Sequence, residues 1–250
     1  MSPSSRRVAQ VVTPEPVVEG AGVHLRRSIG TPRLDHLDPF LLLDHFESVS
    51  PADYEAGFPY HPHRGIETVT IVRKGEILHR DSLWLNLPAS EKMSRPKYRD
   101  LQGEQLTETQ TKDGARIRVI AGETAGLVGP VEGLAVAPKF VDVTLPPGTT
   151  IREVVPRGHA AFAYVDHGEV SFGSSRAPVR APALVIFDDG DTVEASAGPG
   201  GGRFLLAAAR PLGEPIARHG PFVMNTRAEI EQALQDLRVG HFIRDEPRDG

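Results

Sequence analysis

The sequence contains no cysteine among its 250 residues. Disulfides, iron–sulfur clusters and thiol catalysis are therefore excluded. It also lacks an excess of positive charge: the formal net charge is −5 at pH 7, so there is no overall basic field for a nucleic-acid backbone. No run approaches the roughly 18 apolar residues of a membrane span, and the opening residues contain no apolar signal-peptide core. These absences predict a cytoplasmic protein that binds neither membranes nor, directly, nucleic acid.

Turn residues and short β-rich segments dominate what is present. The 25 glycines and 22 prolines exceed the average but stay below the level typical of disorder, and the hydrophobic content of 39% supports a core. Short strand-like runs of β-branched, aromatic and other apolar residues, bounded by Gly, Pro and Asp, include 69–72, 116–120, 140–145 and 203–206. This pattern predicts an all-β fold.

One segment near the end is an exception. Thr226 and Glu229 have the spacing of a capping box, and Gly240 follows the last turn. The sequence therefore predicts a helix over residues 227–238. The apolar residues at helical spacing are Ile230, Leu234 and Leu237. We expect this stripe to pack on a sheet.

An internal repeat predicts two similar β-domains. Four dipeptides carry it at one constant offset: Arg64-Gly65 and Gly75-Glu76 in the first copy, Arg157-Gly158 and Gly168-Glu169 in the second. We place the domains at residues 1–132 and 133–250, with a glycine-rich junction between them.

The two copies differ in length. The second runs from Gly168 to Phe204, whereas the first covers the same interval between Gly75 and Trp84. Roughly 27 residues, enough for several short strands, are therefore missing from the first copy.

The sharpest candidate site is His61-Pro62-His63. Alternation along a strand would place both imidazoles on one face, close enough to share a divalent metal. Glu67 has the same parity, and His79 follows on a neighbouring strand, so either residue could supply a third ligand. Two histidines and a carboxylate with open positions form the site of non-haem iron oxygenases.

The second copy carries no ligands at the matching positions, which are Val154, Pro156 and Ala160. This contrast favours a metal site in one domain over the alternative, a pair of surface histidines beside a proline. Two further segments are predicted to carry no chemistry. The basic segment 92–99 is interpreted as a solvated loop, and the glycine-rich stretch 198–202 as a hairpin connection.

Several longer strings carry a family resemblance. They are Pro59–Thr70, Gly75–Ser82, Leu83–Met93 and Gly220–Thr226. Together they closely resemble the pirin family, from about Arg26 to Arg238. Pirins are bicupins with two stacked antiparallel β-barrels, and most carry one iron in the N-terminal barrel. The resemblance therefore implies a bicupin with a shortened N-terminal barrel and a short C-terminal helix.

The same resemblance makes His61 and His63 the first two metal ligands of the family. The other two, a histidine and a glutamate, come from a later motif that should fall between Ser82 and Leu83 but is absent. The repeat has its shortfall in the same place. We therefore expect iron to bind weakly or incompletely, and we assign no catalytic residue.

The implied function is that of a metal-dependent quercetin 2,3-dioxygenase-like oxidoreductase acting on a flavonol-like small molecule, impaired by its missing ligands. The alternative is a non-catalytic pirin-like protein that binds a protein partner, as other family members do. A third interpretation is an inactive internal-deletion product, which sequencing of the coding region at the Ser82–Leu83 junction would identify.

Overall fold

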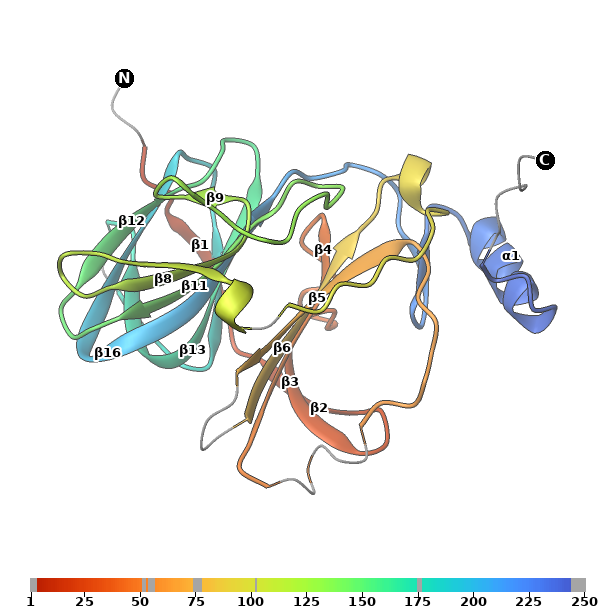
Figure 1. Cartoon of the computed structure of the whole chain (residues 1–250), viewed down its shortest axis with the longest axis horizontal. Helices are drawn as coiled ribbons and strands as arrows, with labels where there is room; N and C mark the ends of the chain where they lie inside the picture. Colours follow the sequence, from red (N-terminus) through yellow and green to blue (C-terminus); the bar gives the residue numbers. More distant parts are fainter. Residues whose placement is uncertain are drawn as a thin grey trace. The chain divides into compact units, whose positions relative to one another are not determined.

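The computed structural model describes residues 4–50, 53, 57–73, 78–101, 103–174 and 177–243, without the side chains of Leu78 and His79. Nearly all its regular structure is β-strand, so the all-β prediction is confirmed (Figure 1).

The chain divides into two compact units. Unit 1 comprises residues 1–15 and 101–211, and unit 2 comprises residues 16–100 and 212–250. Each unit therefore combines segments that are distant in the sequence. The continuous domains 1–132 and 133–250 describe a different division of the chain, and they stay a prediction about its two repeats.

Unit 1 is built on a nine-stranded antiparallel sheet. Its order is β1-β15-β13-β16-β11-β8-β7, while β12 pairs with β16 and β14 pairs with β13. The strands are β1 (Val8–Val12), β7 (Thr107–Gln110), β8 (Arg116–Ala121), β11 (Lys139–Leu145), β12 (Thr150–Val154), β13 (Ala160–Phe172), β14 (Pro178–Arg180), β15 (Ala183–Phe187) and β16 (Thr192–Ala209). A 3-10 turn and a small hairpin accompany them: η3 (Gly103–Gln105), β9 (Glu123–Thr124) and β10 (Leu127–Val128).

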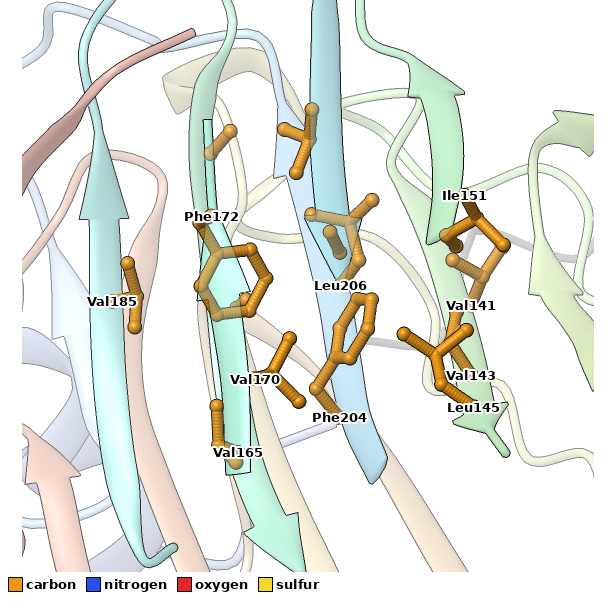
Figure 2. Close-up of a cluster of buried hydrophobic side chains, with 14 of the residues drawn as sticks. Val141, Val143, Leu145, Ile151, Val165, Val170, Phe172, Val185, Phe204 and Leu206 are labelled. Atoms are coloured by element: carbon orange, nitrogen blue, oxygen red, sulfur yellow. The ribbon is translucent and has the colours of Figure 1, made fainter. Parts of the chain in front are cut away.

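Apolar side chains fill the interior of unit 1 (Figure 2). Phe172 meets Phe187 and Phe204 edge-on, with ring centroids 5.4 and 5.3 Å apart. Val and Ala side chains from the neighbouring strands surround these rings. These contacts form the hydrophobic core of unit 1.

The glycine-rich stretch 198–202 lies inside β16, so its interpretation as a hairpin connection is wrong. β13 and β16 stay paired past this stretch, with a register shift between Gly168 and Val170. A Cβ atom on Gly202 would collide with the side chain of Val170 and the backbone of Glu169. Glycine therefore allows a close, bulged strand pair where the sequence pattern indicated a turn.

Unit 2 contains a five-stranded antiparallel sheet with the order β2-β3-β4-β6-β5. Its strands are β2 (Glu15–Glu19), β3 (Val23–Ile29), β4 (Phe40–Ser48), β5 (Ile66–Arg73) and β6 (Leu78–Asn86). A 3-10 turn, a hairpin and a helix complete the unit: η2 (Ala89–Glu91), β17 (Ala217–His219), β18 (Phe222–Met224) and α1 (Arg227–Arg238). β6 crosses the Ser82–Leu83 junction without interruption. Among the described strands, β5 pairs only with β6 and so forms an edge of the sheet.

Helix α1 has the predicted bounds and the predicted capping box. The Thr226 hydroxyl accepts from the Glu229 backbone N–H, and the Glu229 carboxylate accepts from the Thr226 N–H at 2.7 Å. The helix buries Ile230 and Ala233 against β18, whereas Leu237 is 42% exposed. The predicted apolar stripe is therefore wrong at its last position, because the helix packs on a narrow hairpin. None of the helices in the described part of the chain is long and apolar enough to cross a membrane.

Candidate functional site

His61 and His63 lie in an irregular segment that leads into β5, rather than on a strand as predicted. Their rings nevertheless come together, with centroids 4.8 Å apart and planes tilted by 59°. Nδ1 of His61 lies 2.7 Å from the Pro59 carbonyl oxygen. Because that oxygen can only accept, Nδ1 donates the hydrogen. The predicted pairing of the two imidazoles is thus present, although strand alternation does not produce it.

The Arg-Gly that follows the histidines fixes this segment to β18. The Arg64 N–H donates to the Pro221 carbonyl at 3.3 Å, and the Val223 N–H donates to the Arg64 carbonyl at 2.9 Å. Gly65 has φ of +80°, and a Cβ atom there would overlap the Val223 carbonyl oxygen. Only glycine satisfies both conditions. The segment His61–Gly65 therefore contains two backbone anchors, Arg64 and Gly65, as well as two imidazoles.

The Arg64 side chain extends this anchor to the C-terminal segment. Its guanidinium contacts Asp236 of α1 at 2.7 Å, and both side chains are buried. It also donates to the Phe242 carbonyl and lies 4.1 Å from the Phe242 ring centroid. The segment that carries His61 and His63 is consequently held by α1.

Lys92 forms a second buried anchor. Its ammonium donates to the Gly65 carbonyl, the Asn86 side-chain oxygen and the Val223 carbonyl at 3.2, 2.7 and 3.1 Å. Burial lowers the pKa of Lys92 to about 8, although Glu214 and Glu229 partly oppose the shift. The interpretation of segment 92–99 as a solvated loop is therefore wrong at Lys92, which is 3% exposed, and fits the rest of the segment, which is exposed.

An aromatic side chain lies beside the histidines. The ring of His63 is 5.1 Å from that of Trp84 on β6, with planes tilted by 56°. The guanidinium carbon of Arg218 on β17 lies 5.1 Å from the same indole centroid. Although His63 reaches solvent, desolvation of its inner side lowers the pKa of His63, and the neighbouring His61 lowers it further.

Glu67 does not join this group. It stands opposite Leu85 in the β5–β6 ladder, whereas the next residue, Thr68, stands opposite Trp84. Neighbouring residues of a strand point to opposite faces, so Glu67 lies on the face away from Trp84. The backbone of His79 pairs with β4 and β5, but its side chain lies outside the described residues.

Among the described residues, no group of three histidine, aspartate or glutamate side chains is placed to hold a metal ion. The described residues therefore do not make up a complete iron site, because such sites use three or more protein ligands. The sequence identified the two histidines but missed Arg218. The family string Gly220–Thr226 begins two positions after Arg218.

Family models match most of both halves of the chain. The model described as "Pirin" matches residues 22–86, and the one described as "Pirin C-terminal cupin domain" matches residues 140–243. A pirin-like protein of Caulobacter vibrioides is 37% identical, over 95% of this chain and 99% of that protein. Human pirin is 34% identical, over 94% of this chain and 93% of that protein.

Solved structures agree with this relationship. A quercetin 2,3-dioxygenase from Acinetobacter baumannii superposes with a TM-score of 0.86 at 26% identity, covering 96% of this chain and 99% of that one. The Caulobacter alignment extends over 276 residues, more than the 250 of this chain, so the relative contains residues with no counterpart here. That excess agrees with the predicted shortfall, and its position at the Ser82–Leu83 junction stays a prediction. The chain belongs to the pirin family, and its fold is that of a bicupin.

Proposed function

We propose that this chain is a quercetin 2,3-dioxygenase-like pirin in which iron binding, and with it turnover of a flavonol-like substrate, is strongly impaired. The observation that carries the proposal is the pairing of His61 and His63 without a third ligand among the described residues. Two imidazoles hold a divalent metal weakly, because catalytic sites use three or more protein ligands. No step of the reaction is assigned to a residue of this chain.

Iron stoichiometry tests the proposal directly. The protein is loaded with ferrous iron without oxygen, desalted and examined by elemental analysis. We expect far less than one iron per chain, reduced further by His61→Ala and unchanged by His167→Ala, which removes an exposed histidine of unit 1. A ratio near one in the unmodified protein would contradict the proposal.

Turnover is the second test. Dioxygen uptake with quercetin is measured in the iron-loaded protein, in parallel with a family member that has the full ligand set. We expect uptake close to that of free iron alone. Uptake that equals the relative and disappears in His61→Ala would contradict the impairment, and it would show that a third ligand had been recruited.

A second candidate function is binding of a protein partner without catalysis. The observation that favours it is the edge strand β5, in which six of the eight residues are β-branched and none is Gly or Pro. Such edges can accept a further strand from another chain. Thr70 is exposed on this strand, so Thr70→Lys should abolish capture of a specific partner. Val154→Lys, on the exposed end of β12, is the matched control. A partner captured equally by both variants would contradict this function.

The cytoplasmic location stays a prediction.

A further inference from the structure

Three side chains from distant segments meet on an exposed part of unit 2, and we call them the Trp84 cluster: His63, Trp84 and Arg218. His63 and Arg218 are exposed, and Trp84 is half-buried. Both the His63 ring and the Arg218 guanidinium lie 5.1 Å from the indole centroid. The cluster thus brings two aromatic rings and one planar cation together.

Arg218 has no carboxylate partner at hydrogen-bonding distance in the part of the chain that the structure describes. Its guanidinium lies over the Trp84 ring and has long contacts to two carbonyl oxygens, Leu41 at 3.4 Å and Gly220 at 3.5 Å. No described carboxylate lies within 4.0 Å of it. Arg27, in contrast, is held by Asp44 at 2.7 Å and Glu19 at 2.9 Å.

The surroundings of Arg218 favour the arrival of an anion. Desolvation lowers the pKa of Arg218, and the nearby charge of Arg27 lowers it further, while Asp35, Asp44 and Glu19 oppose this from a distance. An arginine stays protonated under such conditions. A bound carboxylate would therefore relieve an unfavourable environment for the cation, and the guanidinium can hold it through two parallel hydrogen bonds.

The aromatic part of the cluster selects a second feature of the ligand. The imidazole of His63 and the indole of Trp84 offer π surfaces on which a planar ring can stack.

We propose that the Trp84 cluster binds a small aromatic carboxylate, with the ring against Trp84 and His63 and the carboxylate on Arg218. This site requires neither a bound metal nor turnover of a flavonol. It therefore goes beyond the proposed function, and either one can fail without the other.

The chain contains a single tryptophan, so its fluorescence reports on this cluster alone. Benzoate is titrated into the full-length protein in the presence of EDTA, which removes any metal. We expect saturable quenching by benzoate and at least about tenfold weaker responses to benzyl alcohol, which lacks the charge, and to acetate, which lacks the ring. Equal responses to benzoate and benzyl alcohol would overturn the role of Arg218.

Substitutions of Arg218 test whether its positive charge holds the carboxylate. Arg218→Gln should weaken benzoate binding about tenfold, and Arg218→Lys should retain part of the affinity without the bidentate geometry. Arg227→Gln removes an exposed arginine of the same unit and should change nothing. Near-ultraviolet circular dichroism of Trp84 verifies that each variant is folded. Binding that survives Arg218→Gln, or an absence of quenching in the unmodified protein, would overturn the proposal.

Discussion

Arg64 and Asp236 are 172 residues apart in the sequence and form a buried ion pair at 2.7 Å. The pair joins the residue that follows the two histidines to the last turns of α1. Gln232, one helical turn earlier, donates to the second oxygen of Asp236 at 2.7 Å, so both oxygens of the carboxylate are bonded. The helix thereby acts on the candidate site without touching the imidazoles.

Removal of Asp236 should destabilise unit 2. Asp236→Ala leaves the Arg64 guanidinium buried without its carboxylate, and we expect the free energy of unfolding to fall by about 3 kcal/mol. Urea denaturation followed by circular dichroism measures the change. Glu231→Ala, which breaks the exposed pair with Arg227, is the control and should cost less than about 0.5 kcal/mol. Similar losses of unfolding free energy in both variants would contradict the larger contribution of the buried pair.

Gly65→Ala should be among the most damaging single methyl additions in unit 2. The new Cβ would overlap the Val223 carbonyl, and the residue would also be held at positive φ. We expect a loss of about 3 kcal/mol or failure to accumulate as soluble protein. Gly148 also has a positive φ, +69°, but a Cβ atom there would meet nothing within 4 Å. Gly148→Ala therefore measures the backbone strain alone, and we expect the free energy of unfolding to fall by about 1 kcal/mol. Equal midpoints of denaturation for the two variants would contradict the predicted overlap of the new Cβ atom with the Val223 carbonyl.

Lys92 gives stability a specific pH dependence. Its pKa is about 8 in the folded chain and about 10.5 when unfolded, so between these values the unfolded state binds more protons. Stability from this residue therefore rises as the pH increases from about 8 to 10.5, by about 2 kcal/mol after allowance for solvent screening. Thermal midpoints of the unmodified chain and Lys92→Met are compared across this range. A constant difference between the two curves would contradict the lowered pKa.

Arg6 should be the most important side chain of the N-terminal segment. It is 1% exposed, and all five of its N–H groups donate within unit 1. The acceptors are the carbonyls of Pro156, His159, Asp188 and Gly190 and the Asp189 carboxylate. Arg6→Ala should lower the free energy of unfolding by about 3 kcal/mol. Arg6→Lys should recover little of this stability because an ammonium has fewer donors. Arg7→Ala, at a side chain that is 78% exposed, is the control for thermal unfolding. Full recovery by lysine would contradict this geometry.

The features that sequence reasoning predicted are those with local causes. The capping box at Thr226 sets the start of α1, and β-branched runs bounded by turn residues mark strands. The constant offset of the repeat predicted two β-domains because it does not depend on how the chain is packed. The capping box and the turn-bounded runs need only neighbouring residues, and the repeat needs only a comparison of two parts of the sequence.

The features it missed depend on contacts between distant segments. Lys92 lies in a basic segment, yet acceptors from Gly65, β6 and β18 surround it. Gly202 lies in a turn-like stretch, yet the approach of β13 keeps it in a strand. His61 and His63 were identified by residue type, but their pairing depends on a backbone anchored at β18. Arg218 had no local signal at all.

The ion pair between Arg64 and Asp236 also dictates an order of events during synthesis. Unit 2 needs residues from both ends of the chain, and the main segment of unit 1 is translated between them. At ribosomal rates of about 5–20 residues per second, Arg64 waits roughly 10–35 s for Asp236 to be made. The unit 1 segment 101–211 is translated during that interval. The segment that carries the histidines therefore gains its anchor to α1 only after the strands of unit 1 have been made.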